Sequence, residues 1–436
     1  MLRICNISRK EAGVFKSLGV MDICVIILYI ISMICIGIYV GKRVQSSKDF
    51  TSAGQKMSLG VVIGSTVATC LGSSIAFGNL ELVHEYGLSG LTSGLFWYVG
   101  WMFLVLLARP LRNSGATSIP TFLATRYNEN TRKISSLCTI IMALSSCAAN
   151  FIAIGVMTQA LGICDATTGT IVGAVIIVLF TIFSGLWGVA ITDTIQSVIL
   201  VIGIGIIVPY AAFSEAGGFS FVMANTAPIR LDPFLGMAPL TMLGWFLANS
   251  LACGAHPAYA QRIFAAKDTK TAQRGTLISN LICVCVMVVA ALPAFCIPFL
   301  FPDMQVGSEF APRFIAGFFP PLLAINRYIV AGSTVIIVIM GLYWNSIYAL
   351  FKIGASAYGA GMFLPLLLGC FWKKANTKAI NIGMFTGCMV SFLWDYLLKR
   401  HTGIDGVILG AGLCLVICVG GSLLLRAHKE PSHEAA

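Results

Sequence analysis

The sequence predicts an all-α, polytopic membrane protein, and three observations lead to this fold class. Apolar residues make up 58% of the 436-residue chain and charged residues only 10%, whereas soluble domains carry about 25% charge. The 28 Lys and Arg and the 17 Asp and Glu residues are too few to cover the surface of a soluble protein of this length. The apolar residues also form long runs, and about 20 apolar residues in a helix cross a bilayer core of ~30 Å.

The apolar runs divide the chain into twelve expected membrane spans. These lie near 21–41, 58–80, 91–108, 135–161, 166–188, 190–213, 236–259, 276–301, 328–345, 348–372, 379–398 and 404–425. Residues 310–325 form a short thirteenth candidate. Because the connections are short, we expect one integral membrane domain over 21–425, preceded by a basic extension at 1–20 and followed by a polar tail at 426–436.

Lys and Arg gather in alternate connections between the runs. The clusters are Lys42/Arg43/Lys48/Lys56, Arg109/Arg112/Arg126/Arg132/Lys133, Arg262/Lys267/Lys270/Arg274, Lys373/Lys374/Lys378 and Arg426/Lys429. Such alternation is typical of the positive-inside rule, and it predicts that these loops are cytoplasmic and residue 21 is outside. The net charge of +11 is therefore better explained by membrane topology than by binding of nucleic acid.

The same rule exposes a mismatch in the second half of the chain. The loops 262–274 and 373–378 both read as cytoplasmic, so an odd number of spans must connect the outer end of span 276–301 to the second loop. Only two full-length spans, 328–345 and 348–372, lie between them. Either residues 310–325 cross as a short segment or one helix is missing.

The span 58–80 is rich in small and hydroxyl residues. It reads LGVVIGSTVATCLGSSIAFGNL and holds four glycines. One interpretation is close packing against neighbouring helices. The other is a helix that unwinds near Gly72, where freed carbonyl groups face a cavity and bind a cation. Composition alone favours neither.

Two further residues stand out because lipid disfavours them. His256 lies beside Pro257, which breaks a helix, and it is either a ligand group or a hydrogen-bonded structural histidine. Asp193 lies at the entry to a long apolar run, where a carboxylate needs water, an ion or a partner. The alternative for Asp193 is a helix N-cap at the membrane interface.

The motifs of enzymes do not occur in the sequence. There is no HExxH, no paired intramembrane Asp and no Walker lysine loop. The 15 Cys lie mostly in apolar runs, without CxxC or zinc-ligand spacing. We therefore expect no enzyme, no cofactor and no metal other than a coupling ion.

Four segments resemble the signature of the sodium:solute symporter family, whose members include sodium/proline, sodium/pantothenate and sodium/glucose symporters. The run Ser184–Gln196 ends in Thr-Asp-x-x-Gln, which is the most specific of the four matches. The others are Ser65 to Gly87, Gln261–Arg262 with the Ala-Lys-Asp at 266–268, and Phe371–Trp372–Lys373–Lys374. They occur in the family's order, and the resemblance covers residues 21 to about 425.

The resemblance implies a five-plus-five inverted-repeat (LeuT-like) transporter fold with an extra N-terminal helix. Sodium would lie between the first and eighth repeat helices. The implied sodium-binding residues are Ala68 and Leu71, through main-chain carbonyls, and Asp193, which matches a carboxylate associated with cytoplasmic sodium release. If the alignment is shifted by one residue, the carbonyls of Thr69 and Gly72 would bind sodium instead. The implied substrate-binding residues are Gly72, Ser73, Ser74, His256 and Tyr259.

The chain departs from the family after residue 324. There the family continues into its eighth repeat helix, with a Ser/Thr pair followed by Asp-Ser, whereas this chain proceeds directly to Ile325–Asn326–Arg327–Tyr328. About one helix and its loop, ~40 residues, are expected to be absent. Ser333–Thr334 is a poor substitute, because Val335–Ile336 follows it. Loop charge and family pattern thus place the gap at the same position.

The sequence therefore predicts sodium-coupled symport of a small organic solute in a plasma membrane or a bacterial inner membrane. The alternative is a transport-defective or sensory relative that retains the symporter scaffold. A channel is less consistent with interrupted helices, which favour a closed midplane site. The expected partners are Na⁺, the solute and membrane lipid, but no nucleic acid; the sequence leaves the oligomeric state open. The hydroxyl-rich span favours an amino acid, carboxylate or vitamin-like acid over a sugar.

Overall fold

The computed structural model describes residues 20–41, 46–160, 163–302 and 347–425. Over these ranges the chain is helical and contains no strand, as the fold class predicts. The spans expected at 310–325 and 328–345, the gap expected after residue 324 and both terminal extensions lie outside the described residues.

The helices follow one another closely along the chain. Their bounds are α1 Val20–Gly41, α2 Ser47–Ser52, η3 Ala53–Gln55, α3 Leu59–Cys70, α4 Ser73–Tyr86, α5 Leu88–Asn113, α6 Ile119–Arg126, α7 Glu129–Ala160, α8 Ala166–Ile202, η4 Gly203–Ile207, α9 Val208–Glu215, α10 Phe219–Ala224, η5 Pro228–Leu231, α11 Pro239–Gly254, α12 Pro257–Ala265, α13 Thr269–Ala291, η6 Leu292–Cys296, α14 Ile297–Leu300, α18 Ile347–Phe371, α19 Thr377–Leu397, α20 Lys399–Thr402, α21 Gly406–Leu415, η7 Val416–Gly420 and α22 Gly421–Leu424.

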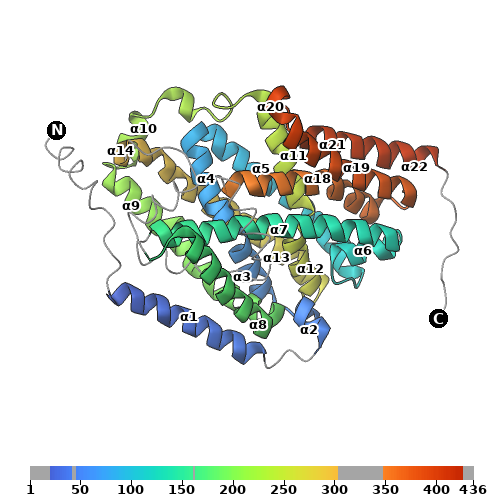
Figure 1. Cartoon of the computed structure of the whole chain (residues 1–436), viewed down its shortest axis with the longest axis horizontal. Coiled ribbons are helices and arrows are strands. Elements are labelled where there is room, and N and C mark those ends of the chain that lie inside the picture. Colours follow the sequence, from blue (N-terminus) through green and yellow to red (C-terminus); the bar gives the residue numbers. More distant parts are fainter. Residues whose placement is uncertain (1–19, 42–45, 161–162, 303–346, 426–436) are drawn as a thin grey trace.

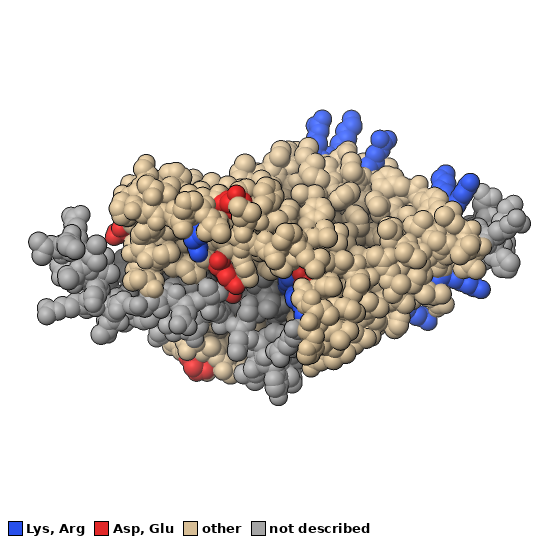
Figure 2. Space-filling view, turned by 90° about the horizontal axis from the view of Figure 1, so that it is seen from above, with Lys and Arg blue, Asp and Glu red and all other residues tan. Residues whose placement is uncertain are grey.

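Within the described ranges, six helical stretches are long and apolar enough to cross a membrane. They are Leu88–Asn113, Glu129–Gln159, Gly185–Glu215, Thr269–Leu300, Lys352–Phe371 and Gly406–Leu424. Figure 2 shows a face of the molecule on which acidic and basic side chains are few. The chain is a multi-pass membrane protein by these features, and the total of twelve full spans stays a prediction.

Two of the expected spans are interrupted. Span 58–80 divides into α3 and α4, because Leu71 leaves the helical region and Gly72 is extended, at φ −61° and ψ 166°. Span 236–259 divides into α11 and α12, because Ala255 is non-helical and Pro257 starts a new helix that His256 precedes. A proline in the first turn has no N–H to continue the preceding helix, and its fixed φ suits a new start. The predicted unwinding near Gly72 is confirmed.

The expected boundary between spans 166–188 and 190–213 is a kink rather than a loop. It lies at Gly185, whose φ of 54° and ψ of −165° are accessible almost only to glycine. The helix resumes directly after it, so the segment that carries Asp193 is a continuous helix. The expected boundary at residue 189 is thus wrong by four positions, because the backbone conformation of Gly185, and not the end of an apolar run, sets where the helix changes direction.

The described helices pack into one bundle, with α1 and α8 side by side at its edge (Figure 1). α3 packs against α8 and α13, and α5 packs against α11 and α13. α18 connects α7 and α11 to the C-terminal helices α19 and α21. The interrupted helices therefore lie inside the bundle.

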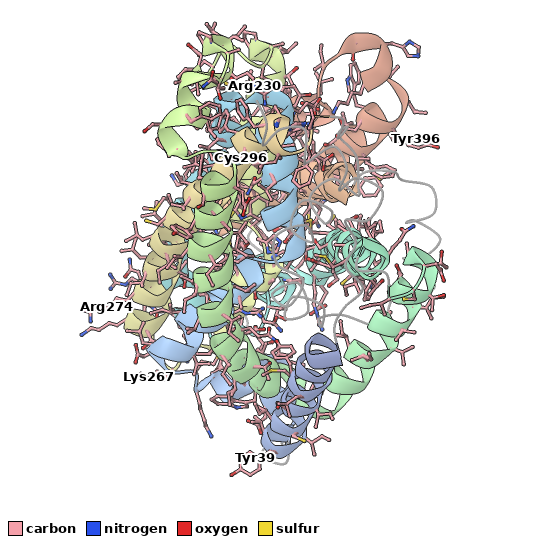
Figure 3. All side chains as sticks on the ribbon, turned by 90° about the vertical axis from the view of Figure 1, so that its left-hand side faces the viewer. Tyr39, Arg230, Lys267, Arg274, Cys296 and Tyr396 are labelled. Carbon is pink, nitrogen blue, oxygen red and sulfur yellow. The ribbon has the colours of Figure 1, made fainter. Side chains whose placement is uncertain are left out.

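Basic loop residues predicted to be cytoplasmic share one end of the bundle. Lys267 and Arg274 lie there together with Tyr39 near the end of α1, whereas Arg230 and Tyr396 lie at the opposite end (Figure 3). At the first end, the backbones of Met57 and Ala266 form an isolated parallel bridge. Met57 N donates to Ala265 O and Lys267 N donates to Met57 O, both at 3.0 Å. This bridge ties the start of α3 to the end of α12.

Candidate functional site

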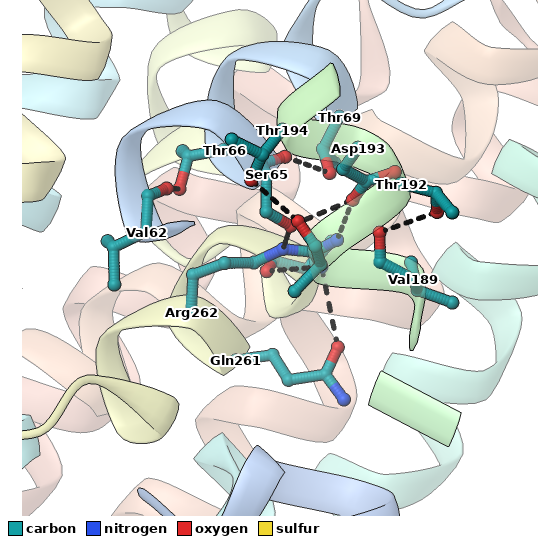
Figure 4. Close-up of polar contacts among 12 residues, drawn as sticks. Val62, Ser65, Thr66, Thr69, Val189, Thr192, Asp193, Thr194, Gln261 and Arg262 are labelled. Carbon is teal, nitrogen blue, oxygen red and sulfur yellow. Dashed lines mark hydrogen bonds and ion pairs between the residues drawn. The ribbon is translucent and has the colours of Figure 1, made fainter. Parts of the chain in front are cut away.

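Ser65, Asp193 and Arg262, which we call the Asp193 cluster, form a buried network between three helices (Figure 4). Arg262 Nη2 lies 3.2 Å from Asp193 Oδ2, and the two side chains are only 8% and 7% exposed. Ser65 Oγ donates to the same carboxylate oxygen at 2.7 Å and accepts from Arg262 Nε at 3.1 Å. The network thus joins α3, α8 and α12.

Two expectations for these residues are wrong. Asp193 is not an N-cap, because it lies well inside α8 and its carboxylate bonds to other helices. Arg262 is not a loop cation, because it is buried in α12 and pairs with Asp193. Buried charges persist when they are paired and hydrogen-bonded. Lys267, before α13, and Lys270 and Arg274, in its first turns, still supply positive charge at this end of the bundle.

The helices around the cluster are in tight contact. A Cβ on Gly64 would lie 2.7 Å from Thr194 Cα, so the backbones of α3 and α8 meet where glycine permits it. Neighbouring hydroxyl groups on Thr66, Thr69 and Thr194 donate to carbonyls one turn earlier in their own helices. These described residues therefore form a closely packed, hydrogen-bonded layer, here called the closed layer, between the helix breaks and the end of the bundle that carries Lys267 and Arg274.

Aromatic side chains connect the two helix breaks. Trp101 of α5 stacks on Tyr259 of α12 with ring centroids 4.3 Å apart, and Trp97 Nε1 donates to the Tyr259 hydroxyl at 3.3 Å. Tyr98 of α5 approaches Cys70, at the end of α3, to 3.7 Å. These contacts place the end of α3 and the start of α12 against the same face of α5.

Polar groups at the breaks include several without partners. His256 Nδ1 and Trp101 Nε1 are buried and have no hydrogen-bond partner among the described residues. The His256 ring lies 4.5 Å from the Tyr259 ring. The Ala255 carbonyl, in contrast, accepts from the Tyr358 hydroxyl of α18 at 2.8 Å. The hydrogen-bonded structural role considered for His256 therefore finds no support at Nδ1.

The predicted site residues thus lie in two places, at the helix breaks and in the closed layer around Asp193. Ala68 and Leu71 are buried at the end of α3, and Gly72 lies in the break. Ser73 and Ser74 begin α4, with side chains outside the described residues. His256 and Tyr259 lie at the second break, whereas Asp193 lies in the closed layer.

Sequence reasoning missed several residues of this region. Asn150 of α7 faces the first break, with Oδ1 3.9 Å from where a Cβ on Gly72 would stand. Trp97, Trp101 and Tyr358 were also missed, because aromatic residues are common in apolar helices. A Gln-Arg pair after the broken helix was noticed, but its link to Asp193 depends on packing.

A second charged group, which we call the Asp405 cluster, lies between α11, α18 and the α19–α21 connection. Lys352 Nζ lies 3.1 Å from Asp405 Oδ1 and 4.2 Å from the centre of the Trp245 ring. Lys399 Nζ contacts the same Asp405 oxygen at 2.5 Å. The side chain of Asp405 is 2% exposed, that of Lys352 11% and that of Lys399 39%.

Comparison with known proteins gives four results. The profile of the Sodium:solute symporter family matches residues 50–324. The osmoregulated proline transporter OpuE of Bacillus subtilis is 23% identical over 93% of this chain and 95% of its own. The sodium/pantothenate symporter of Escherichia coli is 22% identical over 91% of this chain and 95% of its own. The fold is similar to a substrate-bound, outward-open structure of a Na⁺-coupled sialic acid symporter, with a TM-score of 0.70, 15% identity and coverage of 95% of this chain and 100% of that one.

Proposed function

Because the chain belongs to the sodium:solute symporter family, we propose that it couples sodium movement to the transport of a small organic solute. Its relatives are symporters, so it is a transport protein and not an enzyme. The observation that supports the proposal most is the pair of interrupted helices, α3/α4 and α11/α12, whose breaks contact the same face of α5. Broken membrane helices of this kind expose backbone groups for ions and anionic solutes.

The sodium ion is proposed to bind at the end of α3. A helix leaves its last carbonyl groups without intrahelical partners, and its dipole makes this end negative. The carbonyls of Ala68 and Leu71 belong to this region, and those of Thr69 and Gly72 are the alternatives. The unpartnered carbonyl groups and the negative end of the helix dipole both favour a cation here.

The solute is proposed to bind across both breaks, beside Gly72, Ser73, Ser74, His256 and Tyr259. α4 and α12 each begin at a break, so their positive N-terminal ends suit an acidic group on the solute. The unpartnered atoms of His256 and Trp101 offer hydrogen bonds beside Tyr259. A buried polar atom without a partner is destabilising, and a bound solute would supply one. An amino acid, carboxylate or vitamin-like acid fits this arrangement.

Asp193 is proposed to act when sodium leaves toward the cytoplasm. Its carboxylate is held by Arg262 and Ser65 in this structure. A cation that reaches Asp193 competes with the guanidinium group for the same oxygen. Opening of this layer would therefore leave Asp193 paired with sodium in place of Arg262.

Uptake by proteoliposomes that contain the purified 436-residue chain tests the proposal. An inward sodium gradient should drive accumulation from a panel of amino acids, carboxylates and vitamin-like acids, and replacement of sodium by N-methylglucamine should abolish it. Equal uptake without sodium would overturn the proposal. Binding of sodium and solute without accumulation would favour the transport-defective alternative, which assumes a missing helix after residue 324, where the family match also ends.

A further inference from the structure

Gln196 closes the Thr-Asp-x-x-Gln run, and the proposed function gives it no role. Its side chain is polar, and it is buried in a part of α8 that lies in a membrane-spanning stretch. Gln196 Nε2 donates to the hydroxyl of Tyr29 in α1 at 2.8 Å. A polar side chain at such a position needs a partner, and α1 supplies it.

The position of Gln196 relative to Asp193 is informative. The two residues are three positions apart, so their side chains lie roughly 60° apart around the axis of α8. Asp193 faces α3 and α12, and Gln196, one turn later, faces α1. A rotation of α8 that releases one side chain therefore displaces the other.

α1 lies at the edge of the bundle, where it packs along α8 (Figure 1). Its other side chains include the exposed Leu28, at 66%, and Ile31, at 52%, as expected of a lipid-facing helix. The resemblance places this helix outside the ten-helix repeat. A helix with this position can act on the transport core through α8.

We infer that Gln196 and Tyr29 are positioning residues, through which α1 fixes the rotation of α8 and holds Asp193 on Arg262. This inference rests on the proposed function, in which the layer around Asp193 and Arg262 opens when sodium leaves toward the cytoplasm. Without the Tyr29 hydroxyl, the buried Gln196 amide loses its partner and α8 gains rotational freedom. The Asp193 cluster then opens more often.

Hydrogen–deuterium exchange of the chain in lipid nanodiscs tests this inference. Tyr29→Phe should accelerate exchange of backbone amides in Leu59–Ser65 and in Ala258–Ala265 about threefold, the factor that a typical hydrogen bond between membrane helices implies. Tyr39→Phe is the matched control, because it removes a hydroxyl from the same helix at a side chain that is 63% exposed. Faster exchange confined to α1 would overturn the inference.

The double variant Tyr29→Phe/Gln196→Leu separates a specific bond from general loosening. If the two residues act through one bond, the double variant should exchange no faster than Tyr29→Phe alone, because the unpaired amide is gone. Additive acceleration by the two changes would overturn the inference. Exchange is measured without transport, so a failed uptake assay would count against the proposed function and not against this result.

Discussion

The Asp193 cluster and the Asp405 cluster both bury a carboxylate between helices, but they balance its charge differently. Among the described residues Asp193 pairs with one cation, Arg262, and both side chains are less than 10% exposed. Asp405 has two, and Lys399 is 39% exposed. Removal of one lysine leaves Asp405 with another, whereas removal of Arg262 leaves Asp193 without a cation from the part of the chain that the structure describes. The first arrangement suits a contact that must open as a unit, and the second suits a permanent anchor.

The largest effect is expected from Arg262→Met. It leaves Asp193 buried without its cation, and loss of one partner of a buried pair costs about 3–5 kcal/mol. Equilibrium unfolding in mixed micelles measures this loss. The control is the double variant Arg262→Met/Asp193→Leu, which should recover most of the stability because no buried charge is left. A double variant as unstable as the single one would contradict the balance assigned to this cluster.

Asp193→Asn should lower sodium-driven transport without preventing membrane insertion. The Asn oxygen still accepts hydrogen bonds from Ser65 and Arg262, so we expect normal membrane insertion and a stability loss of about 1.5–3 kcal/mol. Sodium-driven uptake should fall about tenfold, which corresponds to ~1.4 kcal/mol. Uptake and sodium dependence equal to those of the wild type would refute a role of this carboxylate in ion release.

Two glycines sharpen the contrast in packing. A Cβ on Gly64 meets the backbone of Thr194, whereas a Cβ on Gly244 meets the carboxylate of Asp405. A backbone cannot move aside locally, but a side chain can. Gly64→Ala should therefore destabilise the protein by about 1–3 kcal/mol, and Gly244→Ala by less. Thermal stability in detergent ranks the two variants, and the reverse order would contradict this reasoning.

The smallest effects are expected in the Asp405 cluster. Lys352→Met removes a buried bond to a charged group but leaves Lys399 in place, so we expect a loss of about 1.5 kcal/mol. Lys399→Met removes a partly exposed cation and should cost between about 0 and 1 kcal/mol. The same unfolding assay applies to both. A loss for either variant as large as that for Arg262→Met would show that the two lysines do not substitute for each other.

The sequence predicted the two interrupted helices better than the kink in α8. Pro257 acts on its own backbone, so local chemistry was enough to find the interruption before α12, whereas composition left unwinding near Gly72 as one of two interpretations. The kink at Gly185 was placed at residue 189, because one glycine among many gives no local sign that it takes a positive φ. Resemblance to a family, and not periodicity, supplied the repeat architecture.

The candidate site was predicted only in part, for a related reason. The cost of a carboxylate in lipid singled out Asp193. Its partner could not be read, because Arg262 lies 69 positions away and followed a proline break that looked like a loop. Asn150 likewise gave no signal, since its relation to Gly72 arises only when α7 packs against the broken helix.

The bridge between Met57 and Ala266 has a mechanical consequence. Two backbone hydrogen bonds join the start of α3 to the end of α12, and Arg112 Nε, at 2.7 Å from Ala266 O, adds a third attachment to α5. We therefore expect a displacement of α3 to move α12 with it, because the two half-helices are joined at the end of the bundle that carries Lys267 and Arg274.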